Sequence, residues 1–272
     1  MLKTRLITGI SLIVLLLIGL FTTDLFAFVL MASGVLLAAA WELSALVGWQ
    51  SYWARGLYVV ICTLLMTITL HLLVYPLIIL VASIICWLLA LWEVLLFPRQ
   101  HLFIDNRWIT TSISIVMLLG CWEALIGLRA LPQGELNVLL LLAILTVVDS
   151  SAFFVGKFWG KRPLAIALSP GKTWVGFYGG LFVGIVFAML VGPLLLNLNW
   201  QQMFSFLIVV VLSCLAAVLG DLFESMLKRK QGVKDSGHIL PGHGGLLDRL
   251  DSLLASAPIF GLGIVLLYNT SL

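Results

Sequence analysis

Two pairs of acidic residues near the end of the chain have side chains and a spacing that suit the binding of a metal ion. Asp221 and Glu224 are three residues apart, and so are Asp248 and Asp251. If a helix includes either pair, its two carboxylates share one face. Carboxylates held close together repel one another, and Mg²⁺ bound by one or two of them together with substrate phosphates would relieve that repulsion. The pattern of residues around them favours a metal site at Asp221, Asp248 and Asp251, and a structural ion network with nearby Lys and Arg is the alternative.

The segment between these pairs, residues 225–251, combines basic side chains with glycines. Glycines let backbone N–H groups approach an anion closely, and lysines add positive charge, so the segment suits a polyphosphate. A basic loop that only holds anionic lipid headgroups is the alternative. His243 precedes Gly244 and Gly245, and for a single histidine a structural hydrogen bond competes with a catalytic role. The basic residues here are Lys228, Arg229, Lys230 and Lys234.

A second polar segment, residues 157–175, includes SPGKTW from Ser169 to Trp174. A P-loop would require glycine at position 166, which is isoleucine here, so we exclude that chemistry. We expect Lys172 to contact a phosphate, with Ser169 and Thr173 as hydroxyl donors. A tight turn before the next apolar segment is the alternative.

The elements that position these residues must be membrane helices. Of the 272 residues, 62% are hydrophobic and 10% charged, whereas soluble chains are about 25% charged. A spanning helix needs about 20 mostly apolar residues. We therefore expect an all-α, polytopic membrane helical bundle that forms one domain, with N-terminal helices in 1–130 and a catalytic part in 137–272. The nine expected spans are 6–23, 25–47, 57–73, 76–97, 108–130, 137–156, 176–197, 204–226 and 252–269.

The basic residues predict the orientation of the bundle. With the amino terminus inside, all but Arg129 of the 15 Lys and Arg residues fall on the inner side, as the positive-inside rule requires. Both polar segments then face the cytoplasm.

A charge inside the membrane costs roughly 2.5–3.5 kcal/mol, so it usually has a partner or a water-filled cavity. Glu42, Glu93 and Asp149 lie within apolar segments, and the sequence does not distinguish a structural role from a place along a cavity. The four cysteines lie singly in apolar stretches and are expected to be small buried hydrophobic residues.

The carboxyl-terminal loop resembles the phosphatidate cytidylyltransferases (CDP-diacylglycerol synthases). That family's pattern is S-x-x-K-R-x-x-x-x-K-D-x-G, then P-G-H-G-G, then D-R-x-D. Residues 149–174 resemble a second block of the family, and Ala40-Trp41-Glu42 a weaker feature. The matching positions are Ser225, Lys228, Arg229, Lys234, Asp235, Gly237, Pro241, Gly242, His243, Gly244, Gly245, Asp248, Arg249 and Asp251.

The resemblance implies that CTP and phosphatidic acid react to give CDP-diacylglycerol and pyrophosphate. A phosphate monoester has a second pKa of about 6, so the lipid phosphate needs no general base near pH 7. The resemblance also implies Mg²⁺, with room for a second cation, at Asp221, Asp248 and Asp251. The expected catalytic residues are Asp221, Asp248, Asp251, Lys234, Asp235 and Arg249. The expected substrate-binding residues are Ser169, Lys172, Thr173, Ser225, Lys228, Arg229, His243, Gly244 and Gly245.

The implied partners are CTP and phosphatidic acid in the membrane, with no nucleic acid, and the family suggests a homodimer in a bacterial inner membrane. The alternatives are a CTP-dependent polyprenol kinase-like enzyme and a secondary transporter. A kinase would release CDP rather than pyrophosphate. A transporter would exchange solute without turnover of CTP, and its usual related halves are not visible in the sequence.

Overall fold

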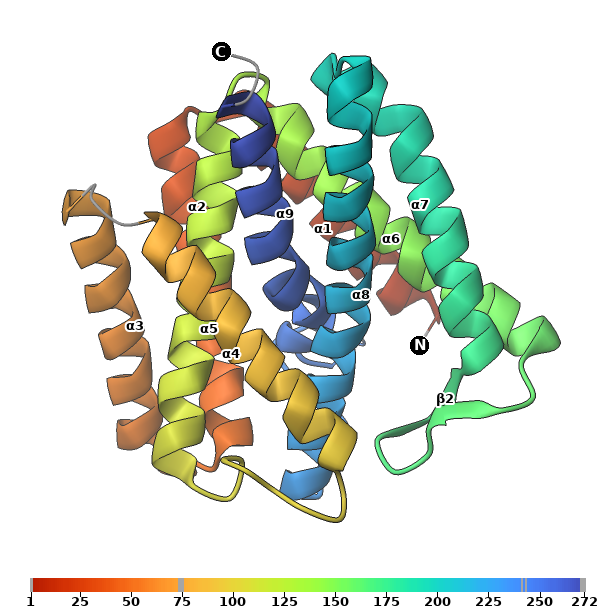
Figure 1. The fold of residues 1–272 in the computed structure, drawn as a ribbon. Helices are drawn as coiled ribbons and strands as arrows, with labels where there is room; N and C mark the ends of the chain where they lie inside the picture. Colours follow the sequence, from red (N-terminus) through yellow and green to blue (C-terminus); the bar gives the residue numbers. More distant parts are fainter. Residues whose placement is uncertain (1, 73–75, 241, 243, 270–272) are drawn as a thin grey trace.

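The chain folds as a helical bundle in a computed structural model, which describes residues 2–72, 76–240, 242 and 244–269 (Figure 1). The first five helices are α1 (Leu2–Thr22), α2 (Leu25–Val47), α3 (Tyr52–Leu72), α4 (Pro76–Leu96) and α5 (Arg107–Ala130). They are followed by α6 (Gly134–Trp159), α7 (Trp174–Leu196), α8 (Trp200–Gln231) and α9 (Asp251–Asn269). A two-stranded hairpin of β1 (Pro163–Ala165) and β2 (Ser169–Thr173) and the 3₁₀ turn η1 (Leu247–Arg249) complete the elements.

Eight of the described helices, α2 to α9, are long and apolar enough to cross a membrane. The remaining predicted span, 6–23, corresponds to α1, in which Thr8–Thr22 is a shorter apolar helix. These helices confirm the predicted polytopic helical membrane bundle. The hairpin β1–β2 is the departure from an all-helical chain, and it lies between the sixth and seventh predicted spans.

Short polar residues and glycines set the helix ends. Asp24 accepts a hydrogen bond from the amide of Ala27 at the start of α2, which ends at Gly48 with a left-handed φ of 111°. Asn199 and Gln202 form a reciprocal capping box at the start of α8. Each cap satisfies backbone groups that the first or last turn leaves unpaired.

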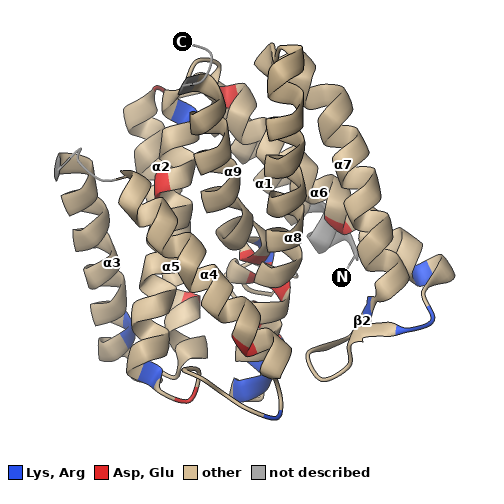
Figure 2. Ribbon diagram, in the orientation of Figure 1, with Lys and Arg blue, Asp and Glu red and all other residues tan. Residues whose placement is uncertain are grey.

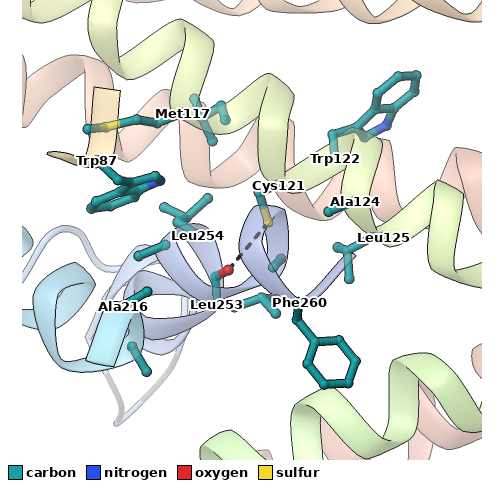
Figure 3. Packing of buried hydrophobic residues seen from close by; sticks show 14 of the residues in the cluster. Trp87, Met117, Cys121, Trp122, Ala124, Leu125, Ala216, Leu253, Leu254 and Phe260 are labelled. Atoms are coloured by element: carbon teal, nitrogen blue, oxygen red, sulfur yellow. Dashed lines mark hydrogen bonds between the residues drawn. The ribbon is translucent and has the colours of Figure 1, made fainter. Parts of the chain in front are cut away.

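Helix α9 occupies the centre of the bundle, between α5 and α8 (Figure 1). Small residues allow this close packing, because a Cβ at Gly261 would lie 2.9 Å from Ala124 of α5 and one at Gly263 would overlap Val209 of α8. Small residues take the same role at helix interfaces in membranes generally. Figure 3 shows the α5–α9 contact, where the Cys121 thiol lies 3.8 Å from the Leu253 carbonyl oxygen.

Most basic segments lie in the half of the bundle that contains the α2–α3 and α4–α5 loops and the hairpin (Figure 2). The opposite end contains Arg129, whose guanidinium pairs with Glu135 at 2.8 Å and donates to the Thr23 carbonyl. The structure thus keeps the charge asymmetry that the sequence indicates, and both long polar segments lie at the basic end.

Candidate active site

Helix α8 carries the first part of the candidate site as a stripe of polar residues. Asp221 is three and four residues before Glu224 and Ser225, and Lys228 is four and three residues after them, so the four side chains lie along one side of the helix. The Ser225 hydroxyl donates to Asp221 Oδ1 at 3.4 Å, and Lys228 Nζ lies 2.9 Å from Glu224 Oε2. The prediction that Asp221 and Glu224 share a helix face is confirmed.

Gly220 brings the start of α9 against this stripe. A Cβ at Gly220 would overlap the Asp251 carbonyl oxygen and would lie 3.1 Å from the Ala255 Cβ, so no larger residue fits without a shift of the helices. The close approach puts Asp221 and Asp251 near enough for their charges to interact, and Asp149 of α6 interacts with both. Asp149, Asp221 and Asp251 thus form a three-carboxylate cluster in the electrostatic sense, since the charge of each acts on the others.

Lys172 supplies the positive charge that this cluster requires. Its Nζ forms an ion pair with Asp221 Oδ2, and its charge also acts on Asp149 and Asp251. Lys172 reaches the cluster from β2, which pairs with β1 in antiparallel fashion. The ammonium group thus pairs with one carboxylate and interacts electrostatically with two more, in a position where a cation is favoured.

A second ion group forms around Lys228. Its Nζ lies 2.7 Å from Asp248 Oδ1 in addition to its contact with Glu224. The side chains are largely buried, with 15% of Lys228, 13% of Asp248 and 4% of Glu224 exposed. The two acidic pairs therefore come together, but each acid interacts with a member of the other pair. Glu224 and Asp248 share Lys228, and the charges of Asp221 and Asp251 interact.

Asp248 and Asp251 do not lie on one helix, so the condition under which they would share a helix face is not met. Helix α9 begins at Asp251, and Asp248 lies in the preceding 3₁₀ turn η1. The turn forms because Asp248 Oδ2 accepts hydrogen bonds from the amides of Ser236 and Gly245, at 3.0 and 2.9 Å, which draws this segment back onto the loop.

The same contacts set the pKa of Asp248. Burial alone would raise it, but the hydrogen bond from Lys228 and those from the amides of Ser236 and Gly245 outweigh burial. The pKa of the carboxyl group therefore lies below its ordinary value, and Asp248 is ionised at neutral pH.

The hairpin β1–β2 is joined to the rest of the site at both ends. Thr173 is the N-cap of α7, and its hydroxyl oxygen accepts a hydrogen bond from the amide of Gly176 at 3.1 Å. From α8, Arg229 Nε donates to the Leu168 carbonyl at 3.1 Å. Thr173 thus has the capping role expected of a turn before a helix, while Lys172 beside it reaches the carboxylates.

The remaining predicted residues line the surface around these two ion groups. Lys234, Asp235, Arg229 and Arg249 are exposed, and Ser169 is half-buried. Gly244 has a left-handed φ of 88°, which favours glycine. Gly245 is buried, and its amide is used by Asp248 rather than directed at the surface. His243 lies outside the described residues.

Three acidic residues within apolar segments have partners that the sequence left undetermined. Asp149 joins the three-carboxylate cluster, whereas Glu42 and Glu93 each bind a loop. Glu93 is fully buried and accepts hydrogen bonds from the amides of Leu102, Phe103 and Ile104. Glu42 contacts the loop that holds Asp248. Their only sequence signal is an acid in an apolar span, which implies a partner without naming it.

The residues present suit Mg²⁺ in their chemistry, since it prefers oxygen ligands from one or two carboxylates and from phosphates. The charges of Asp221 and Asp251 interact, and Glu224 Oε1 is buried without a hydrogen-bond partner among the described residues. In the described part of the chain, no three His, Cys, Asp or Glu residues are grouped closely enough to form a complete metal site. A metal site at Asp221, Asp248 and Asp251 stays a prediction. The positive charges beside Asp221 and Asp248 in the structure are those of Lys172 and Lys228.

Comparisons with known proteins give a match over nearly the whole chain. Residues 3–267 match the model of the cytidylyltransferase family. The chain is 35% identical over 260 residues to the phosphatidate cytidylyltransferase of Pseudomonas aeruginosa, which covers 96% of each chain. It is 39% identical over 189 residues to that of Haemophilus influenzae, 64% of each chain. It is 39% identical over 176 residues to that of Bacillus subtilis, 62% of this chain and 65% of the relative.

Proposed function

Because the chain belongs to the cytidylyltransferase family, we propose that it is a phosphatidate cytidylyltransferase, which condenses CTP with phosphatidic acid to CDP-diacylglycerol and pyrophosphate. A phosphate oxygen of the lipid attacks the α-phosphorus of CTP. The bond from that phosphorus to the oxygen that bridges to the β-phosphate breaks, and pyrophosphate leaves with the electron pair. The family match supports this enzyme over the transporter alternative.

The observation that carries the proposal is the alternation of acids and lysines at the start of α9. Lys172 pairs with Asp221 and interacts electrostatically with Asp149 and Asp251, and Lys228 lies between Glu224 and Asp248. Such a site can hold polyphosphate through its cations and a metal through its carboxylates. Substrate phosphates that engage the lysines would free the acids, and this exchange couples the two binding events.

The location of the site suits one soluble and one lipid substrate. Acidic segments gather partway along the bundle, where α9 begins, and basic segments lie toward the nearer end (Figure 2). The acyl chains of phosphatidic acid can stay among the apolar helix faces while CTP enters from water. We propose that this end faces the cytoplasm of a bacterial cell and that the membrane is the inner one.

The basic residues divide into two groups by exposure. Arg229, Lys234 and Arg249 are exposed and suit the first contact with the triphosphate, whereas Lys172 and Lys228 are more buried and suit the reacting phosphate groups. Positive groups fixed where charge develops stabilise the transition state without reorganisation. No Ser or His nucleophile is needed.

We propose Asp221, Asp248 and Asp251 as Mg²⁺ ligands, with a second cation admitted by the same acids. A bound Mg²⁺ would neutralise phosphate charge and align the two substrates. The acids themselves supply oxygen ligands, and Lys172 and Lys228 hold them in place beforehand. The homodimer that the family resemblance suggests also stays a prediction, which light scattering on the purified protein would test.

The experiment is pyrophosphate release by the purified protein in detergent with CTP, Mg²⁺ and phosphatidic acid. We expect release that depends on the lipid, stops with EDTA and is lost in Asp221→Asn and Asp248→Asn. Asp105→Asn is the matched control, because Asp105 is an exposed acid that pairs with Lys230. Release of CDP instead would indicate a lipid kinase. A folded wild type that releases no pyrophosphate would contradict the proposal, and active Asp248→Asn would contradict only the metal assignment.

A further inference from the structure

Glu42 of α2 is a buried carboxylate that has no role in the proposed reaction. Its side chain is 2% exposed, and Oε2 accepts hydrogen bonds from the Leu247 amide at 2.8 Å and the Ser236 hydroxyl at 3.1 Å. The two donors lie 205 and 194 residues later in the chain. One oxygen from the amino-terminal half thus holds both ends of the loop between α8 and α9.

This loop is the one that fixes Asp248. The Ser236 amide donates to Asp248 Oδ2 at 3.0 Å, and the Ser236 hydroxyl oxygen accepts from the Asp248 amide at 3.3 Å. Ser236 therefore links Glu42 to both the backbone and the side chain of Asp248. Leu247, the other residue held by Glu42, directly precedes Asp248 in the 3₁₀ turn.

Two glycines of the loop make room for Glu42. A Cβ at Gly237 would overlap Glu42 Oε1, and a Cβ at Gly245 would overlap the Ser236 hydroxyl and lie 2.7 Å from Glu42 Oε2. These two glycines make room for a carboxylate of the same chain, whereas the sequence suggested that glycines of this loop approach a substrate phosphate. The absence of a side chain at both positions lets the Glu42 carboxylate enter the loop.

The arrangement has an energetic cost that favours a functional role. Glu42 Oε1 is buried without a hydrogen-bond partner among the described residues. A buried polar atom left without a partner destabilises a fold. Residues that orient the groups in contact with substrate or metal typically change affinity or activity by about 10- to 100-fold when removed.

We infer that Glu42 is a positioning residue of the active site, which acts as a hydrogen-bond acceptor for Ser236 and Leu247 and thereby fixes the Asp248 carboxylate. The activity consequence rests on the proposed function, while the structural consequence does not. The amino-terminal helices accordingly contribute to the geometry of the site as well as to the bundle.

Hydrogen exchange followed by mass spectrometry tests the structural consequence without any turnover. In Glu42→Ala, peptides that contain Ser236, Gly245 or Leu247 should exchange faster than in the wild type. Peptides of the hairpin, 163–173, should be unchanged, because Glu42 makes no recorded contact with them among the described residues. Unchanged exchange of the loop would overturn the inference, whatever the activity.

Kinetics on the same proteins separate positioning from general destabilisation. Glu42→Ala should lower kcat by about 10- to 100-fold, with the KM for phosphatidic acid within twofold of wild type. Glu42→Gln keeps an acceptor oxygen and should retain at least a third of kcat. Ser236→Ala should add no further loss to Glu42→Ala, because the two residues act in one path.

Glu93→Ala is the matched control, since Glu93 is also a buried acid that accepts loop amides. It should lower the melting temperature but leave the kcat of the folded enzyme within threefold. Equal kcat losses in Glu93→Ala and Glu42→Ala, or in Glu42→Gln and Glu42→Ala, would overturn the inference. A wild type that is folded but inactive would refute the proposed function instead, and exchange alone would then decide whether Glu42 positions the loop.

Discussion

Removal of the Lys228 ammonium group should destabilise the protein more than removal of any exposed lysine. In Lys228→Met the apolar stem stays, while Glu224 and Asp248 lose the cation they share at 2.9 and 2.7 Å. Glu224 is 4% exposed and Asp248 13%, so water cannot easily replace the lysine. The variant leaves two carboxyl groups facing each other in a largely buried space without the cation that they share.

The size of the effect follows from the burial. Removal of one partner from a buried ion pair costs about 3–5 kcal/mol, and the partial exposure of Lys228 places this case near about 3 kcal/mol. At about 2–4 °C per kcal/mol for a chain of this size, the melting temperature should fall by roughly 6–12 °C. In the control Lys230→Met, the lost pair joins a 30% exposed lysine to a 68% exposed Asp105, so the loss should stay below about 1 kcal/mol.

Thermal unfolding in detergent, followed by the fluorescence of the ten tryptophans, measures these differences. A second change, Glu224→Gln in Lys228→Met, should recover part of the lost stability because it removes one of the two unpaired carboxyl groups. A melting temperature of Lys228→Met within 2 °C of wild type, or no recovery in the double variant, would refute the reasoning.

The remaining predictions concern three other contacts. Gly220→Ala should lower the free energy of unfolding by about 1–3 kcal/mol, because a Cβ would overlap the Asp251 carbonyl oxygen. The control Gly127→Ala, where nothing lies within 4 Å of an added Cβ, should be neutral or stabilising. Equal melting temperatures of the two variants would contradict the α8–α9 contact. Thr173→Val removes the cap of α7 and should cost about 1 kcal/mol, with Thr173→Ser nearly neutral; unfolding of all three proteins checks this. The pKa of Asp248 is lowered in the fold, so its contribution to stability is complete above the ordinary Asp pKa of about 3.9 and disappears as pH falls through the lower folded value. The fall in melting temperature below pH 4 should therefore be shallower in Asp248→Asn than in the wild type. An unchanged slope would contradict this role of Asp248.

Several helices could be predicted closely because local signals set their ends, whereas α3 and α8 extend up to five residues beyond the predicted 57–73 and 204–226. The predicted 25–47 and 76–97 correspond to Leu25–Val47 and Pro76–Leu96, since long apolar runs and short polar caps depend only on nearby residues. The spacing of Asp221 and Glu224 on one helix was predictable for the same reason.

The partners of the acids were not predictable, because they depend on contacts between distant segments. Asp248 leaves the helix that its spacing to Asp251 suggests, since the amides of Ser236 and Gly245 compete for its carboxylate. Glu42 meets Ser236 across 194 residues. An acid within an apolar span signals that a partner exists, and only the packed bundle identifies it.

Transfer of label from CTP to lipid tests the central claim most directly. The purified wild type receives phosphatidic acid, Mg²⁺ and CTP labelled with ³²P at either the α or the γ phosphate, and the lipid is extracted and counted. The proposed function predicts label in the lipid from the α position only, with the γ label recovered as pyrophosphate. Label in the lipid from the γ position, or from neither, would contradict it.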